Sequence, residues 1–103
     1  MKSGFFRSAN FKLNHMNYSV YILYSDHFDR YYVGQTNNIE NRIKRHNSGY
    51  VRSTKPYRPW KLVFQTNLKD RGAAMQLETK LKSYKSRDKI EETIESDMNS
   101  LKK

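Results

Sequence analysis

The sequence predicts a small α+β domain whose strands and helices follow the order β-β-α-β-α-α. Two short β-prone runs surround a polar turn near the start of the chain, which is typical of a hairpin. A third such run lies in mid-chain, and the apolar residues that follow it recur at helical spacing. At 103 residues the chain has room for one modest core, so we expect a single domain over residues 16–103.

The strands are expected where β-branched and aromatic residues gather. Residues 20–24 form a short apolar run that suits a central strand, and a polar turn leads to a second strand at residues 31–33. This second strand is closed by Gly34. Residues 50–60 hold both prolines and should form a loop, whereas residues 61–66 are predicted to form the third strand.

Side chains suited to helix termini mark three helices. Asn37 or Asn38 can cap the first helix, and Gly49 is a natural stop for it. Asp70 can cap a second helix and Ser86 a third, each with apolar residues at helical spacing behind it.

Residues 1–15 differ from the rest of the chain, because they contain no acidic residue and show no clear hydrophobic period. We expect a disordered leader with Met16 as a natural start, and the alternative is a basic arm that lies on nucleic acid. The apolar residues are too scattered for a signal peptide. No run of 18 apolar residues occurs, so we expect no membrane partner.

The charge balance points to a polyanionic partner. Lys and Arg number 20 against 10 Asp and Glu, which gives a net charge of +10 and an isoelectric point near 9.9. Such an excess on a small domain indicates DNA, RNA or an anionic membrane. The lack of cysteine excludes a disulfide scaffold, a zinc finger and a cysteine nucleophile. It also fits a reducing compartment, and we expect a cytoplasmic protein.

The basic charge is concentrated between residues 41 and 69, where no acidic residue occurs. Tyr50, Tyr57 and Trp60 are interleaved with it and can offer stacking faces, as in a segment that follows a phosphate backbone. The alternative is a merely solvated basic loop. The acidic residues gather instead on the last helix, which should face away from a polyanion. Within the basic stretch we expect substrate contacts from Lys44, Arg45, Arg52, Lys55 and Arg58.

Two polar residues share the apolar face of the first helix. Ile39, Arg42, Ile43 and His46 follow the spacing i, i+3, i+4 and i+7, which places them on one stripe. The simplest interpretation is that Arg42 extends to the rim of the core and that His46 is a hydrogen-bonded histidine near the helix end. The other interpretation is that both belong to a polar site.

The second helix repeats this anomaly with the opposite charge. Glu78 lies beside the apolar stripe formed by Ala74, Leu77 and Leu81, and a half-buried carboxylate needs a partner. One possibility is an Arg42–Glu78 salt bridge between the two helices. The other is a pocket for phosphodiester chemistry, where a guanidinium holds phosphate oxygens and a carboxylate holds Mg²⁺.

These residues resemble the GIY-YIG nuclease domain. Ser19-Val20-Tyr21 and, eleven residues after the first tyrosine, Tyr32-Val33-Gly34 are similar to its paired tyrosine signature. The helix NNIENRIKRHNSG is similar to the family's helix with a catalytic arginine and a following histidine. The segment AMQLETKLKSYK carries a glutamate where the family has its metal ligand. The resemblance covers about residues 18–90, and the loop ending RPWKLVF is similar to that of the short stand-alone bacterial members.

The resemblance implies a three-stranded antiparallel sheet flanked by helices and Mg²⁺- or Mn²⁺-dependent cleavage of DNA. Tyr21 and Tyr32 would line the site near the attacking water, and a phenolate general base would need a nearby cation. Arg42 would stabilise the transition-state phosphate, and His46 would orient a tyrosine or contact phosphate. Glu78 would be the one protein ligand of the metal.

The resemblance also implies a role for Gly34, which would let the backbone approach phosphate closely. Two positions depart from the family pattern. Ser19 replaces the first motif glycine, and Gln35 stands where some members carry a lysine that can help to activate water.

The sequence therefore favours a DNA endonuclease that is structure-selective or weakly sequence-selective on double-stranded or branched DNA. The alternative is a non-catalytic nucleic-acid-binding protein that retains the pocket. A third hypothesis, a basic protein that binds acidic membranes or proteins, lacks the basic amphipathic helix that it needs.

Overall fold

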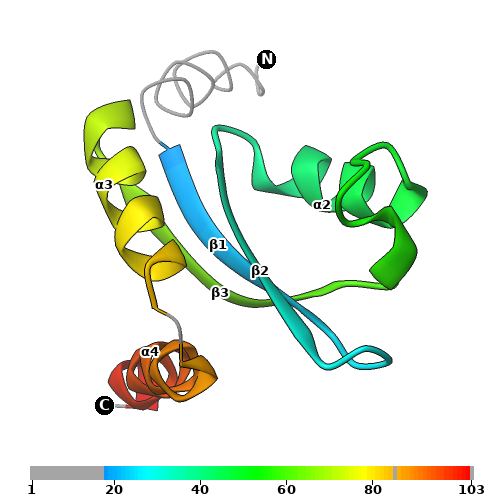
Figure 1. Cartoon of the computed structure of the whole chain (residues 1–103). Helices are drawn as coiled ribbons and strands as arrows, with labels where there is room; N and C mark the ends of the chain where they lie inside the picture. The colour runs from blue at the N-terminus through cyan, green and yellow to red at the C-terminus, as the bar shows by residue number, and fades with distance from the viewer. Residues whose placement is uncertain (1–17, 85, 103) are drawn as a thin grey trace.

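A computed structural model describes residues 18–84 and 86–102, so the predicted leader at residues 1–15 and Met16 lie outside the described residues. The elements follow the predicted order β-β-α-β-α-α and confirm the α+β class (Figure 1). The strands are β1 (Tyr18–Ser25), β2 (Arg30–Thr36) and β3 (Lys61–Leu68), the helices are α2 (Ile39–Ser48), α3 (Arg71–Lys82) and α4 (Arg87–Lys102), and the loop before β3 contains a short 3₁₀ turn, η1 (Lys55–Tyr57).

The three strands form one antiparallel sheet in the order β2-β1-β3. Tyr21, in the central strand, lies opposite Gly34 on one side and Gln65 on the other. The strands extend beyond the predicted runs, because polar residues such as Gln35 and Thr36 continue the pairing of β2 with the start of β1. Hydrophobic pattern alone does not reveal such polar strand ends.

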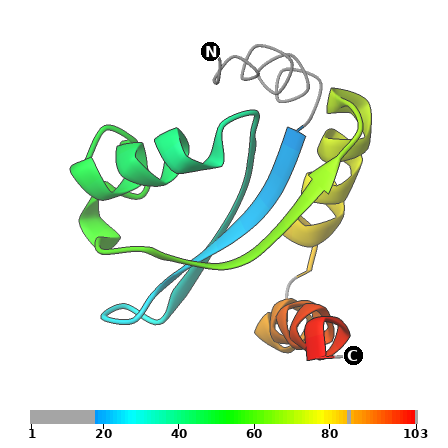
Figure 2. The same cartoon turned by 180° about the vertical axis from the view of Figure 1, so that it is seen from behind.

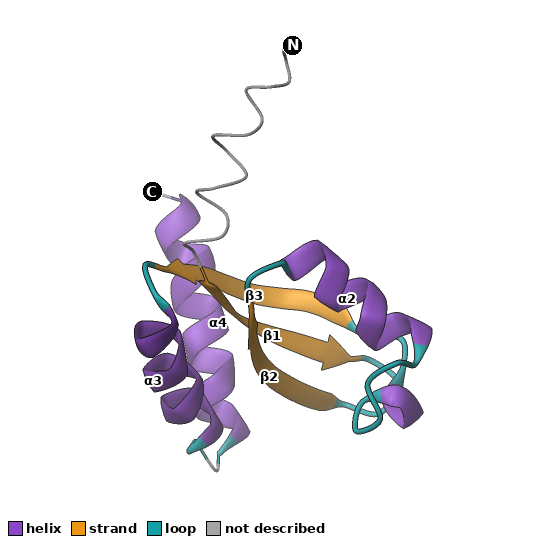
Figure 3. Cartoon of the chain, turned by 90° about the horizontal axis from the view of Figure 1, so that it is seen from above, coloured by secondary structure: helices purple, strands orange, loops and turns teal. Residues whose placement is uncertain are grey.

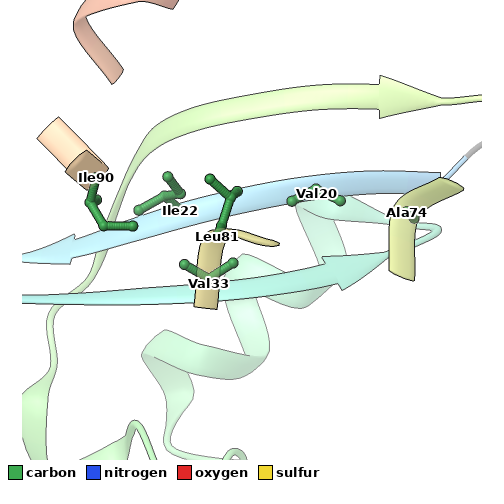
Figure 4. Packing of buried hydrophobic residues seen from close by; sticks show 6 residues of the cluster. All are labelled: Val20, Ile22, Val33, Ala74, Leu81 and Ile90. Atoms are coloured by element: carbon green, nitrogen blue, oxygen red, sulfur yellow. The ribbon is translucent and has the colours of Figure 1, made fainter. Parts of the chain in front are cut away.

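Helices cover both faces of the sheet, with α2 on one side and α3 and α4 on the other (Figures 2 and 3). Alternate residues of β1 therefore enter two different cores. One core packs Val20, Ile22 and Val33 against Ala74, Leu81 and Ile90 (Figure 4). The other core is smaller and contains Tyr21, Leu23, Trp60 and the partly buried Tyr32, Ile39, Ile43 and Tyr57.

The predicted helix caps are confirmed by their hydrogen bonds. The side chains of Asn38 and Asp70 each accept from the backbone N–H three residues later, at 3.1 and 2.9 Å. Ser86 accepts from the backbone N–H two residues later, at 3.1 Å. Gly49 ends α2 with a φ of +90°, a left-handed conformation that favours glycine.

Polar contacts fasten α4 to the β1–β2 hairpin. Arg87 donates to both carboxylate oxygens of Asp29, at 2.9 and 2.7 Å, and the Tyr31 hydroxyl donates to Glu91 at 3.1 Å. The acidic helix is thereby held on the side of the sheet opposite α2. None of the described helices has the length and apolar character needed to cross a membrane.

Candidate active site

The candidate site is centred on Tyr21, which points from β1 towards α2 and is fully buried. The backbone partner of Tyr21 in β2 is Gly34, and a Cβ atom there would lie 2.6 Å from the Tyr21 hydroxyl oxygen and 3.1 Å from the Tyr32 ring. Glycine is therefore required so that the Tyr21 phenol can lie across β2. This packing gives a reason for Gly34 that differs from the expected approach of its backbone to phosphate.

His46 lies opposite Tyr21 on the inward face of α2 and is also fully buried. The Tyr21 hydroxyl oxygen and His46 Nε2 are 3.0 Å apart, and the Tyr32 ring packs edge-on against the imidazole with centroids 4.9 Å apart. Because a buried phenol needs an acceptor, Tyr21 donates its proton to Nε2. The other ring nitrogen, Nδ1, lies 2.8 Å from the Thr54 hydroxyl.

Burial sets the protonation states of this pair. Burial, followed by the positive charges of Arg42 and Arg45, lowers the pKa of His46 to about 4, so the imidazole is neutral near pH 7. Burial also raises the pKa of Tyr21 well above its ordinary value, and Tyr32 and Glu78 add to the rise while Arg42 opposes it. The free site therefore holds a neutral phenol hydrogen-bonded to a neutral imidazole.

Arg42 lies one helical turn before His46 and is half-buried. The suggested salt bridge between Arg42 and Glu78 is wrong, because within the described ranges Glu78 pairs instead with Lys82. The Lys82 ammonium lies 3.0 Å from Glu78 Oε2, in an i, i+4 pair that helical spacing makes easy to form. Arg42 forms no ion pair with any described carboxylate and so remains available to an anion.

Glu78, on α3, is hydrogen-bonded to β2, the edge strand that also carries Tyr32 and Gly34. Its side chain is 19% exposed, and Oε1 accepts a 2.8 Å hydrogen bond from Gln35, the residue after Gly34. A carboxylate oxygen has two lone pairs, so both oxygens retain room for a metal ion. Mg²⁺ often takes one or two carboxylates and completes its shell with water and phosphate, and Glu78 fits that requirement. The described residues contain no group of three or more His, Cys, Asp or Glu side chains that could form a fuller cage.

The expected substrate contacts lie on α2 and the loop that follows it. These basic side chains are exposed, and Lys55 and Arg58 line an open groove of about 600 Å³ together with Asn47, Pro56 and Pro59. The exposed residues are Lys44, Arg45, Arg52, Lys55 and Arg58.

Only part of the expected stacking surface is accessible. Tyr50 is 77% exposed, and the Arg45 guanidinium lies 5.8 Å from its ring centroid. Trp60, by contrast, is 5% exposed, and its indole N–H donates to the Thr54 carbonyl at 2.9 Å. The expectation that Trp60 offers a stacking face is wrong, because this residue anchors the loop in the smaller core.

Two contacts of the site could not be foreseen from helical or strand periodicity. Thr54 lies in the loop and meets His46 only because the loop folds back on α2. Gln35 stands where some members of the family carry a lysine, yet its side-chain amide donates a hydrogen bond to Glu78.

This arrangement is that of a small nuclease-like domain with paired tyrosines. The comparison with known proteins agrees with this class. Residues 17–91 match the family model described as the GIY-YIG catalytic domain, and the chain belongs to the GIY-YIG family.

Its relatives include short proteins of the same kind. The UPF0213 protein SH2523 of Staphylococcus haemolyticus (strain JCSC1435) is 37% identical over 60 residues, which cover 57% of this chain and 73% of that protein. The solution NMR structure of the UPF0213 protein BH0048 from Bacillus halodurans is 32% identical. That match covers 76% of this chain and 83% of the other, with a TM-score of 0.49.

Proposed function

We propose that the protein is a Mg²⁺-dependent DNA endonuclease that hydrolyses phosphodiester bonds with structure selectivity or weak sequence selectivity. One observation carries the proposal: the buried Tyr21–His46 pair lies within the electrostatic reach of the Arg42 guanidinium and of the Glu78 carboxylate. Such a set can activate a water molecule and stabilise the charge that develops on a phosphate. Membership of the GIY-YIG family supports a nuclease.

Tyr21 and His46 act together as the general base in this proposal. As Tyr21 takes a proton from the attacking water, its own phenolic proton passes to His46 Nε2 along the 3.0 Å hydrogen bond. A free phenolate, which burial disfavours, is never required. The water oxygen forms a bond to phosphorus, and the bond from phosphorus to the leaving oxygen breaks.

Substrate binding makes His46 a better base. Arg42 lowers the pKa of His46 in the free protein, and a phosphate that binds Arg42 neutralises this repulsion. The planar guanidinium can hold two phosphate oxygens at once. Tyr32 is half-buried and its ring packs against those of Tyr21 and His46, so we assign its hydroxyl to the attacking water or the scissile phosphate.

Glu78 would hold the metal ion, Mg²⁺ or Mn²⁺, with Gln35 orienting the carboxylate. When bound, the ion neutralises phosphate charge and stabilises the leaving oxygen. In the free protein Lys82 pairs with this carboxylate, but the Lys82 side chain is 53% exposed, and such an i, i+4 pair is weak enough for a metal ion to displace it.

Double-stranded or branched DNA is the proposed partner, with its backbone on α2 and the following loop. The exposed basic side chains there supply contacts that depend on phosphate rather than on base identity. A cytoplasmic location suits an enzyme that acts on cellular DNA.

A nicking assay tests this function. Supercoiled plasmid and a branched duplex are incubated with the protein in Mg²⁺, in Mn²⁺ and in EDTA, and we expect nicked product only with metal. The alternative, a non-catalytic nucleic-acid-binding protein, is favoured by the Lys82–Glu78 ion pair that occupies the metal ligand. Tight DNA binding with no cleavage in either metal would establish that alternative.

A further inference from the structure

We propose that Thr54 is a positioning residue that fixes the tautomer of His46 and thereby ties the basic loop to the catalytic base. The catalytic consequence rests on the proposed function, whereas the tautomer does not. Thr54 lies eight residues beyond His46, and neither the resemblance nor any spacing in the sequence identifies it.

The hydrogen bonds of Thr54 indicate which ring nitrogen of His46 carries the proton. Thr54 is 1% exposed, and its hydroxyl donates to the Val51 carbonyl at 3.3 Å. With that proton directed to Val51, the hydroxyl oxygen, 2.8 Å from His46 Nδ1, is placed to accept a proton from this nitrogen. His46 therefore carries its proton on Nδ1, and the Nε2 lone pair faces the Tyr21 hydroxyl. This tautomer also gives the buried Tyr21 hydroxyl the acceptor that it needs, so both hydrogen bonds of the imidazole are satisfied together.

The loop holds Thr54 in place through its backbone. The Thr54 carbonyl accepts from the Trp60 indole at 2.9 Å and from the Tyr57 backbone N–H at 3.1 Å. Asn47, the residue after His46, closes the arrangement because its amide exchanges two hydrogen bonds with the Trp60 backbone, at 2.7 and 3.0 Å. The loop and the end of α2 thus form one fastened unit around the imidazole.

This unit also carries the groove side chains. Lys55 follows Thr54 directly, and Arg58 donates from Nε to the Lys55 carbonyl at 2.8 Å. A DNA phosphate bound by Lys55 and Arg58 therefore contacts the same short segment that positions His46. The groups that face His46 from the surrounding elements are Tyr21 and Tyr32 on the sheet, Arg42 and Arg45 on α2, and Thr54 on the loop.

The test reads the tautomer directly. The full chain is labelled with ¹⁵N-histidine, and long-range ¹H–¹⁵N correlation at pH 7 identifies the protonated ring nitrogen of His46, assigned with a His46→Gln variant. We expect the Nδ1–H form in the wild type and in Thr54→Ser, and a shift towards Nε2–H in Thr54→Val. An Nε2–H wild type would overturn the proposal, and so would a folded Thr54→Val protein that keeps the Nδ1–H form. The wild-type spectrum decides even if Thr54→Val fails to fold.

Cleavage assays test the catalytic consequence of the Thr54–His46 hydrogen bond. In single-turnover assays at saturating protein we expect Thr54→Val to cleave at least about tenfold more slowly, because a wrong tautomer cannot accept the tyrosine proton. Thr54→Ser should restore most of the rate, and both variants should bind DNA as the wild type does. Equal cleavage by Thr54→Val and wild type would contradict the positioning role. If the wild type itself does not cleave DNA, the proposed function is wrong. The NMR spectra still test the assigned tautomer of His46 in that case.

Discussion

Arg42 is the residue whose chemistry can be tested with the smallest change. Its guanidinium is half-buried on the inward face of α2 and has no carboxylate partner among the described residues, and we propose that it holds a substrate phosphate. Lys would preserve the charge but not the planar two-pronged geometry.

We expect Arg42→Lys to fold, to bind DNA within a few-fold of wild type, and to cleave at least about tenfold more slowly. The comparison should use single-turnover conditions at saturating protein, so that weaker binding is not mistaken for lost chemistry. Lys44→Arg, an exposed change on the same helix, is the matched control. Near-normal cleavage by Arg42→Lys would show that Arg42 does not clamp phosphate and that its role is structural.

His46 makes the stability of the protein depend on pH. Its pKa is about 4 in the folded protein and near the ordinary value of 6.5 in the unfolded chain. The unfolded state therefore binds more protons between these values, and the contribution of His46 to stability is lost as the pH falls from about 6.5 towards 4.

Urea unfolding across pH 4 to 7 measures this loss as a falling free energy of unfolding. The dependence of the free energy of unfolding on pH should largely disappear in His46→Gln. It should persist in the control His27→Gln, because His27 is exposed on the hairpin turn. The same slope in all three proteins would mean that another group is responsible.

At the level of elements, the loop between α2 and β3 has two parts with different tasks. Thr54 and Trp60 are buried and hold the loop to the end of α2, whereas Lys55 and Arg58 are exposed along the groove. The buried part gives the loop a defined conformation, and we propose that the exposed part contacts a phosphate backbone.

Replacing Lys55 and Arg58 together by Ala should weaken DNA binding similarly for unrelated sequences. The slope of the logarithm of the DNA-binding constant against the logarithm of the salt concentration should flatten by up to about 2 units. Each phosphate contact contributes about 0.9 to this slope. Fluorescence anisotropy over a salt series measures this slope. A double Ala variant of the distant Lys80 and Lys89 controls for the loss of net charge, and an unchanged slope in the loop variant would exclude backbone contact there.

Across the whole molecule, α2 and its loop are rich in basic residues, whereas α4 carries half of the acidic residues. The basic helix α2 and its loop lie on one side, and α4, with the exposed Asp88, Glu92 and Glu95, lies on the other (Figure 3). A field of this kind would turn the α2 face towards a polyanion during approach.

Much of this molecule follows from local signals in the chain. Asn38 and Asp70 accept the hydrogen bonds expected of helix caps, and Gly49 adopts the left-handed conformation that its position suggested. The helical stripe also placed Arg42 and His46 on the inward face. These predictions succeed because capping and periodicity depend on neighbours in sequence.

Long-range contacts were not predictable in the same way. Glu78 pairs with Lys82 and Gln35 rather than with Arg42, and this choice depends on how α3 lies along the β2 edge. Trp60 is buried by the path of its loop, although its sequence context resembled a stacking surface. Thr54 meets His46 through the same loop path, which no spacing rule encodes.

Glu78→Gln shows whether the pocket around Tyr21 and His46 performs metal-dependent cleavage, as we propose. Glutamine keeps the shape of Glu78 and removes the charge that would hold the ion. Single-turnover cleavage and DNA binding should be measured for this variant and wild type in Mg²⁺, with circular dichroism as the check on folding. We predict a folded variant that binds DNA and no longer cleaves it, and cleavage at the wild-type rate would contradict the claim.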